Sequence, residues 1–220
     1  MMRLKRKREY RQNRIWFMAL FSRLVCTSII MTAVLSYNAN SASAHPHVFV
    51  LQRIIFQFDD KGFAGFRMQW KFDEMFSSMI IEDYDKNKNN QLEPSEVKEI
   101  KEKAFSYISN FNYFSFIKIN GEPFEVKYTK DFSARIEKHK LMYEFFIPCH
   151  VAATEAAKNV SIATYDPSYY SAIYFAEKRS VALENSDNFH ITTAVREDKS
   201  TSIYHGMVNP WAAFLDFRKK

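Results

Sequence analysis

The sequence predicts an α+β protein: a β-rich domain, built as an antiparallel sheet or sandwich, with an inserted EF-hand-like helix-loop-helix. Three observations predict this class. Apolar and polar residues alternate over several short segments, turn-forming residues separate those segments, and aromatic residues make up 16% of the chain, which suits a sandwich core. We expect one domain over residues 45–200, with the helical insertion at 73–110 and a C-terminal tail at 201–220 that forms a short amphipathic helix or a disordered end.

Residues 1–44 have the pattern of a cleaved secretory signal peptide. Basic residues precede an apolar run from Leu24 to Leu35, and Ala42-Ser43-Ala44 provides the small residues of a cleavage site. A retained membrane anchor is the alternative, because residues 15–37 are nearly long enough to span a bilayer. Arg23 lies within that stretch and favours cleavage. We therefore expect a periplasmic protein with no stable membrane insertion after cleavage.

The charge of the chain changes when this segment is removed. The complete sequence has a formal net charge of +6 at pH 7, but its first 44 residues contain eight basic residues and one acidic residue. The remainder has 23 basic and 24 acidic residues, a net charge of −1. The positive charge therefore belongs to the export segment, and nucleic acid is not an expected partner.

Hydrophobic alternation and turn signals place the other elements. Strands are expected at 48–58 and 66–72, joined by a hairpin turn at residues 59–62. Asp73 is expected to cap a helix that extends towards Glu82, and Pro94 and Ser95 begin a second helix that ends near Ile108. Further strands are expected at 113–119, 124–128, 141–147, 160–165, 169–175 and 189–195.

Between the two expected helices, residues 85–96 match the twelve-residue calcium loop of an EF-hand. Oxygen-bearing side chains stand at loop positions 1, 3, 5, 9 and 12, as calcium requires. The loop has a net charge of −1, and Asn90 replaces the usual glycine, so we expect weak binding, with a Kd of roughly 10⁻⁴ to 10⁻³ M. A polar loop that binds no ion is the alternative. The predicted calcium ligands are Asp85, Asn87, Asn89, Gln91 through its carbonyl oxygen, Glu93 and Glu96.

A second metal site is predicted at the expected new amino terminus, His45-Pro46-His47. The terminal amine and the two imidazoles could converge on a copper, nickel or zinc ion, because residues i and i+2 of an extended segment face the same side. Pro46 lacks the amide hydrogen that the common amino-terminal copper motif uses, so another ligand is needed. A surface segment that binds no metal is the alternative. Candidates for the additional ligand are His190, His205 and Asp166.

Two other residues carry weaker signals. Cys149 has no partner cysteine in the expected mature protein, so burial is the simplest expectation for its side chain. Asp166 begins an Asp-Pro turn among three tyrosines, which is typical of a structural turn.

Four motifs follow one another along the chain: Ala-His-Pro-His-Val-Phe-Val at 44–50, Trp-Lys-Phe-Asp-Glu-Met-Phe at 70–76, Leu-Glu-Pro-Ser-Glu at 92–96 and Tyr-Asp-Pro-Ser-Tyr-Tyr at 165–170. In this order they resemble a bacterial family, the domain of unknown function one thousand and seven. The resemblance runs from His45 to about Val195. The family is described as the periplasmic component of an uncharacterised ABC-type transport system, and its members often lie near metal exporters or importers. It implies a role in metal handling and assigns no catalytic residue.

These observations favour a non-enzymatic, metal-binding accessory protein of a membrane transport system, with an inner-membrane transporter as its partner. Calcium would stabilise the helical insertion rather than act as a switch, because the sequence contains a single loop of low charge. Two alternatives remain open. One is a copper enzyme of the histidine-brace type, and the other is a partner-binding module whose only ion is calcium.

Overall fold

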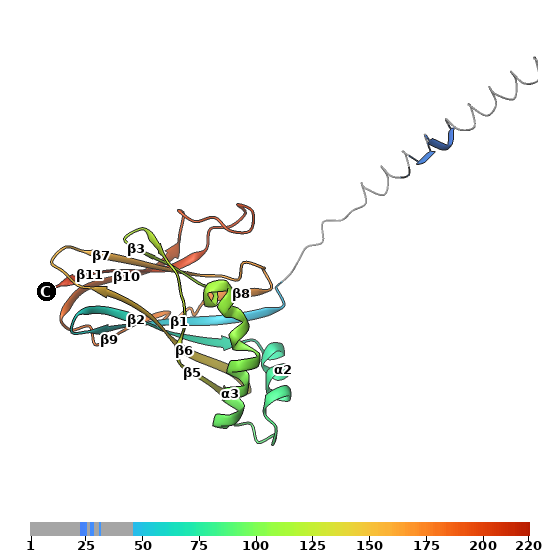
Figure 1. Ribbon diagram of the computed structural model, residues 1–220, viewed down its shortest axis with the longest axis horizontal. Coiled ribbons are helices and arrows are strands. Elements are labelled where there is room, and N and C mark those ends of the chain that lie inside the picture. The colour runs from blue at the N-terminus through green and yellow to red at the C-terminus, as the bar shows by residue number, and fades with distance from the viewer. Residues whose placement is uncertain (1–22, 26, 29–30, 32–45) are drawn as a thin grey trace, which may run out of the picture. The chain divides into compact units, whose positions relative to one another are not determined.

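The computed structural model describes residues 23–25, 27, 28, 31 and 46–220, and the chain divides into two compact units, residues 1–43 and 44–220 (Figure 1). In the first unit the described residues are helical. Among all described residues, no helix has the length and apolar character needed to cross a membrane. The expected cleavage site at 42–44 and His45 lie outside the described residues, so the export signal remains a prediction.

The second unit contains two β-sheets, which we call sheet A and sheet B. Sheet A is mixed. Its strands run in the order β5-β6-β2-β1-β8, and β9 also pairs with β1. The strands of sheet A are β1 (Val48–Asp59), β2 (Gly62–Phe72), β5 (Lys130–Glu137), β6 (Lys140–Ala152), β8 (Ser171–Phe175) and β9 (Val181–Glu184).

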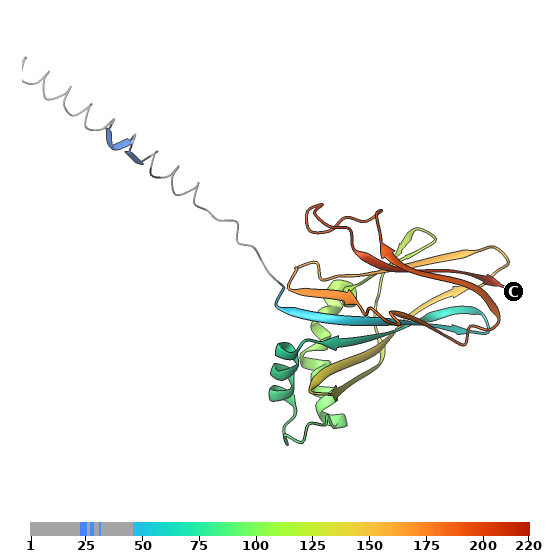
Figure 2. The same cartoon turned by 180° about the vertical axis from the view of Figure 1, so that it is seen from behind.

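Sheet B is antiparallel, in the order β10-β11-β7-β3-β4. Both views show its strands lying over those of sheet A (Figures 1 and 2). The strands of sheet B are β3 (Ser115–Ile119), β4 (Glu122–Phe124), β7 (Lys158–Thr164), β10 (Phe189–Glu197) and β11 (Trp211–Lys219).

Three helical segments follow β2: α2 (Glu74–Tyr84), α3 (Pro94–Lys103) and the 3₁₀ segment η1 (Phe105–Phe114). Asp73 caps α2 as predicted, because its carboxylate accepts a hydrogen bond of 2.9 Å from the Phe76 amide. Helices α2 and α3 lie side by side at one end of sheet A (Figure 2). The helical insertion therefore covers the end of the domain at which β2 finishes.

Aromatic side chains join the two sheets. Phe58 of β1 packs against Phe189 of β10 and Phe217 of β11, with ring centroids 5.0 and 5.4 Å apart. Gly65 lets β2 approach β6 closely, because a Cβ atom at this position would lie 2.4 Å from the Ile147 carbonyl oxygen. Aromatic packing thus joins the two sheets, and Gly65 permits the close pairing of β2 with β6 within sheet A.

The α+β class and the β-rich organisation are confirmed, but sheet A is not purely antiparallel. Strand β1 pairs in parallel with both β8 and β9. These strands return to β1 only after the chain has contributed β3, β4 and β7 to sheet B. Parallel strands need a long connection, and here the chain passes through sheet B before it returns to β1. The alternation of side chains within one strand does not show in which direction its partner runs.

The prediction that residues 201–220 form a short helix or a disordered end is wrong for the last part of this segment. Its last part forms β11, which lies between β10 and β7 in the interior of sheet B. Ala213, Leu215 and Phe217 alternate on the buried face of this strand. Strands β5 and β9 were also not predicted from the sequence. All three strands depend on partners that are distant in the chain or on short runs with weak alternation.

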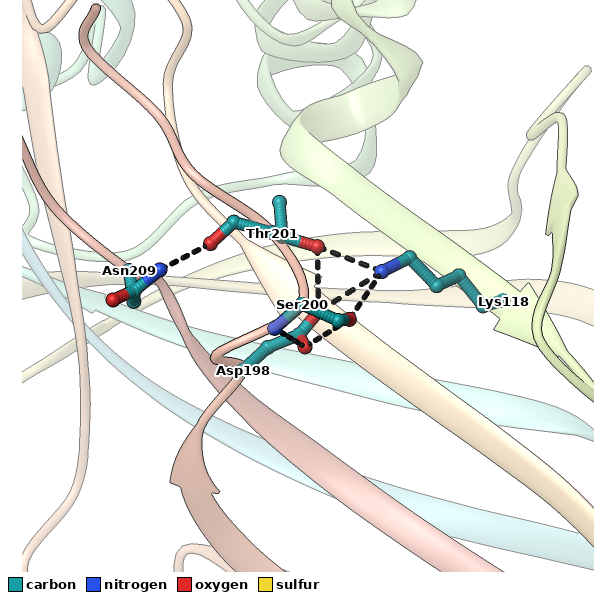
Figure 3. A network of polar contacts seen from close by, with 5 residues as sticks. All are labelled: Lys118, Asp198, Ser200, Thr201 and Asn209. Atoms are coloured by element: carbon teal, nitrogen blue, oxygen red, sulfur yellow. Dashed lines mark hydrogen bonds and ion pairs between the residues drawn. The ribbon is translucent and has the colours of Figure 1, made fainter. Parts of the chain in front are cut away.

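A polar network around the buried Asp198 connects β3 to the segment between β10 and β11 (Figure 3). Lys118 Nζ lies 3.1 Å from Asp198 Oδ2 and 2.7 Å from Thr201 Oγ1. Ser200 donates its amide to the Asp198 carboxylate, and the Asn209 amide donates to the Thr201 carbonyl oxygen. Burial alone would raise the pKa of Asp198, but hydrogen bonds from Ser200, Thr201 and Lys118 outweigh it, and the pKa lies well below its usual range.

We expect Lys118→Met to lower the free energy of unfolding by about 2 kcal/mol, because the Asp198 carboxylate stays buried after its charged donor is lost. Urea denaturation measures this change. The control is Lys98→Met, which removes an exposed ion pair to Glu102 of 3.9 Å and should have little effect. Equal losses in the two variants would contradict a stabilising role for the network.

Candidate metal-binding loop

The loop between α2 and α3 closes around the Asp85 carboxylate. Asp85 is only 3% exposed. Its Oδ1 accepts a hydrogen bond of 3.1 Å from the Asn89 amide nitrogen, and its Oδ2 accepts one of 2.8 Å from that of Asn90. Asn90 has a φ angle of +61°, the left-handed conformation expected where calcium loops have glycine. Asp85 thus fixes the sharp turn of the loop from within.

The side-chain oxygens of the next two predicted ligands also accept hydrogen bonds from backbone amides of the loop. Asn87 Oδ1 accepts a hydrogen bond of 3.0 Å from the Asn89 amide, and Asn89 Oδ1 accepts one of 2.7 Å from the Gln91 amide. Each side-chain oxygen has a second lone pair, so these hydrogen bonds do not exhaust its capacity as an acceptor. Leu92 packs against the hydrophobic core and connects the loop to the domain.

Glu96 connects the two ends of the loop. It is 6% exposed, and its two oxygens accept hydrogen bonds of 2.8 Å from the Lys86 amide and 3.0 Å from the Glu93 amide. The bond from the Glu93 amide to Glu96 is one half of a capping box at the start of α3, where Pro94 occupies the first turn. The last predicted ligand is therefore held in position by the backbone of both helix ends.

Glu93 is the least satisfied acid of the loop. Its Oε1 accepts hydrogen bonds from the side-chain amides of Asn87 and Asn89 at 3.1 and 2.7 Å. Its Oε2 is buried and has no hydrogen-bond partner among the described residues. The side-chain interaction with Glu96, followed by those with Asn89 and Asn87, lowers the pKa of Glu93 to about 2. The carboxylate therefore stays ionised near neutral pH.

The acids of the loop make no direct ion pair among the described residues. In the part of the chain that the structure describes, no ion pair joins Asp85, Glu93 or Glu96 to a basic side chain. The same part contains no group of three or more His, Cys, Asp or Glu side chains arranged to hold a metal ion. The loop offers instead a mixed set of carboxylate, amide and carbonyl oxygens, the donors that calcium takes and that copper or zinc does not prefer.

At the other predicted site, the structure describes only His47. This side chain is exposed, its amide donates a hydrogen bond of 2.8 Å to the Tyr170 carbonyl oxygen, and its ring lies 5.1 Å from the Tyr170 ring. His190 is an exposed residue of β10, paired in register with Arg218, and His205 is exposed in a turn. Neither is brought into a described cluster with His47.

Asp166 is fully engaged in its own turn. It is 3% exposed, and its carboxylate accepts hydrogen bonds from the amides of Ser168 and Ser171 at 2.8 and 2.9 Å. The structure therefore favours the structural role. Cys149 is buried as predicted, and burial raises the pKa of its thiol to about 12, which leaves it unreactive near neutral pH.

Two cavities were not predicted from the sequence. One, of about 530 Å³, lies between β8 and the segment 203–211, with Tyr165, Tyr174, Tyr204 and Trp211 among its lining residues. The other, of about 290 Å³, lies between sheet A and η1, and Trp70 and Tyr143 line it. Trp70 and Tyr143 occupy inward positions of their strands, where the sequence pattern indicates only core packing.

The chain belongs to the family of proteins of unknown function DUF1007, whose sequence profile matches residues 30–210. The family predicted from the four motifs is therefore confirmed. An "Uncharacterized 15.5 kDa protein in trpE 3'region" of Spirochaeta aurantia is 26% identical over 136 residues, 62% of this chain and 96% of that protein. An "Uncharacterized protein" of Haemophilus influenzae is 27% identical over 141 residues, 63% of this chain and 66% of that protein. Neither name assigns an activity or mentions transport.

We expect the Glu93 carboxylate to stabilise the calcium-free loop at neutral pH and to lose this contribution in acid. Its pKa is lowered from 4.5 to about 2 in the folded protein. The stabilisation is therefore complete above pH 4.5 and disappears as the pH falls towards 2. An NMR titration of the Glu93 carboxyl carbon measures the pKa directly. Urea denaturation should show that the difference between wild type and Glu93→Gln shrinks over this range, and a constant difference would contradict the assignment.

Proposed function

We propose that the protein is a periplasmic, non-enzymatic metal-binding accessory protein of a membrane transport system, and that calcium bound at residues 85–96 stabilises its helical insertion. The observation that supports calcium most directly is the buried Glu93 Oε2, which has no hydrogen-bond partner among the described residues, in a loop whose Asp85 and Glu96 are also buried. Hydrogen bonds alone hold these acids in the loop, and a divalent cation would add direct charge pairing to them.

In this proposal the helix-loop-helix is of the EF-hand type. Asp85, Asn87, Asn89, Glu93 and Glu96 would supply side-chain oxygens, and Gln91 would supply its carbonyl oxygen. Calcium would contribute positive charge to the loop. Glu93 must exchange its hydrogen bonds with the Asn87 and Asn89 amides for the ion, so weak affinity is expected. Since the loop connects α2 to α3 and anchors through Leu92, binding would stabilise the helical end of the domain.

The proposed role in transport rests on the family resemblance and on the amino-terminal histidines. His45 and His47, with a free terminal amine after cleavage, would bind copper, nickel or zinc and present the metal to an inner-membrane transporter. The exposure of His47 supports an accessible site. A histidine-brace copper enzyme would use the same residues but would turn over a substrate, and a calcium-only binding module would bind no transition metal.

For the calcium site, we expect about 10 mM calcium to raise the melting temperature by about 5 °C, because a ligand with a Kd near 10⁻³ M adds about 1 to 2 kcal/mol to the free energy of unfolding. Glu96→Gln should abolish most of this shift, because it removes charge from the last predicted ligand. Differential scanning calorimetry with calcium and with a chelator measures both. Glu102→Gln, an exposed residue outside the loop, is the matched control and should keep the shift. If the melting temperature of the wild type is the same with calcium as with the chelator, the calcium proposal is overturned.

For the amino-terminal site, we expect one extra residue before His45 to weaken copper binding by about tenfold or more, because it displaces the amine from the two imidazoles. Isothermal titration of a chelator-treated protein that begins at His45 measures the affinity. The control carries the same extra residue after Lys220. Equal affinities would exclude the terminal amine as a ligand, and copper-dependent turnover would favour the enzyme.

A further inference from the structure

Each of the two described sheets ends on both sides in edge strands, whose outer backbone groups face away from the sheet. Such an edge attracts other strands, and proteins usually protect it with short strands, prolines, bulges or charges. Three of the edges carry such devices. Strand β4 has three residues and contains Pro123, while β8 and β9, which share one edge of sheet A, have five and four. Strand β5 has an irregular register between Lys130 and Ser133.

Strand β10, the other edge of sheet B, is long and regular. Among the described strands it pairs only with β11, over nine residues and without a register shift. It contains neither proline nor lysine, and Arg196 and Glu197, its residues with a formal charge at neutral pH, stand at its C-terminal end. The part of the strand from Phe189 to Val195 therefore lacks the usual protection against pairing with another strand.

The backbone groups of β10 that face its open side can be identified from the hydrogen bonds at its two ends. At one end the Lys220 amide donates to the Asn188 carbonyl oxygen at 3.2 Å. At the other end the Asp198 amide donates to the Pro210 carbonyl oxygen at 2.8 Å. Because residues of an antiparallel strand alternate between its two sides, the even-numbered residues bond to β11 and the odd-numbered residues face away from it. The odd-numbered residues at the centre of the strand, which have no backbone partner among the described residues, are Ile191, Thr193 and Val195.

The side chains of these three residues lie on the inner face of sheet B. They share this face with the buried Phe189, which packs against Phe58 of β1, because side chains alternate along a strand. Ile191 and Val195 are half-buried and pack against the core. Thr193, between them, is exposed although it faces inward, so sheet A does not cover the edge of β10 there. A strand added beside β10 would extend sheet B and cover the apolar side chains on either side of Thr193.

A second copy of the same strand is complementary to this edge. In an antiparallel pair with a two-fold axis at Thr193, Ile191 of one copy lies opposite Val195 of the other. The backbone groups that face the open side then meet one another as hydrogen-bonded pairs, because the paired residues are all odd-numbered. All nine residues of β10 are paired in this arrangement.

Other two-fold registers suit the strand less well. With the axis at Ala194, the apolar Ile191 lies opposite the charged Glu197. With the axis at Thr192, Arg196 and Glu197 extend beyond the end of the partner strand. The register centred on Thr193 therefore pairs the whole strand and keeps the apolar side chains together.

We propose that two copies of the protein associate through their β10 strands, antiparallel and centred on Thr193, so that sheet B continues from one copy into the other. Nine residues on each side are fewer than the roughly 20 to 30 on each side of a standard stable interface. We therefore expect a weak dimer, with a Kd on the order of 10⁻⁴ M. The association uses neither the loop at 85–96 nor the amino-terminal histidines, and it does not require a metal ion.

Disulfide formation between two variants tests the register. In the proposed dimer Thr192 of one copy lies opposite Ala194 of the other, as a non-hydrogen-bonded pair whose Cα atoms are about 4.5 Å apart, within the range of disulfides. A mixture of Thr192→Cys and Ala194→Cys, oxidised with diamide, should therefore form a mixed disulfide, which mass spectrometry identifies. Both positions are exposed, so the substitutions should not disturb the core.

Each variant oxidised alone is the matched control. Within one variant the two cysteines would be diagonal neighbours about 7 to 8 Å apart, too far for a disulfide, so cross-linking should be at least about tenfold slower. Wild type, with its native cysteines, is the blank. Efficient cross-linking of Thr192→Cys alone or of Ala194→Cys alone would overturn the register, because each indicates an axis at the substituted residue.

Sedimentation velocity tests the association itself. Wild type should change from monomer to dimer between about 10 μM and 1 mM, as a Kd on the order of 10⁻⁴ M requires. Thr193→Lys should weaken association by about tenfold or more, because it places two like charges opposite each other at the axis. Thr193 is exposed, so the melting temperature of the dilute variant should match that of wild type.

Thr154→Lys, an exposed substitution of the same charge outside β10, is the matched control and should associate as wild type does. The proposal is overturned if wild type stays monomeric throughout this range of concentration, including the case in which β10 pairs only with a strand of another protein. It is also overturned if Thr193→Lys associates as tightly as Thr154→Lys, because the copies then meet through another surface.

Discussion

The pairing of β1 with strands on both of its sides is the constraint on which the rest of the domain depends. On one side β1 pairs with β2 in an antiparallel register, and on the other it pairs in parallel with β8 and then β9. Alternate residues of β1, from Val48 to Phe58, are buried between the sheets. Because β1 is central, the first hairpin, the helical insertion and the returning strands are all positioned relative to a single strand.

The two ends of the domain differ in how completely their side chains are packed and paired. Near Phe58 the two sheets are joined by tightly packed aromatic rings, and Lys118 and Asp198 secure the segment that follows β10. At the opposite end, where α2, α3 and η1 cover sheet A, acids without cations and donors without acceptors are concentrated. A cation would suit the acids of the loop, because calcium binds carboxylate, amide and carbonyl oxygens.

Much of the fold was predictable because it depends on neighbours in the chain. The alternation in β1 and β2, the cap at Asp73, the start of α3 at Pro94 and the left-handed Asn90 all follow from short-range chemistry. The parallel pairing of β8 and β9 did not follow, since nothing within a short strand specifies a distant partner. The sequence indicated a structural turn at Asp166 and also left it as a candidate ligand, and its hydrogen bonds to Ser168 and Ser171 favour the turn.

The sequence by itself therefore determined the class of the domain, its family and the order of oxygen atoms in the loop at 85–96, because residues a few positions apart produce each of these. Tertiary structure decided which of those oxygens remain unsatisfied, that β11 is an interior strand, and that Trp70 and Tyr143 meet on one buried face. Burial and partnership are properties of atoms brought together from distant segments. A pattern within one segment indicates which way a side chain faces, but not whether a distant segment supplies a hydrogen-bond partner for it.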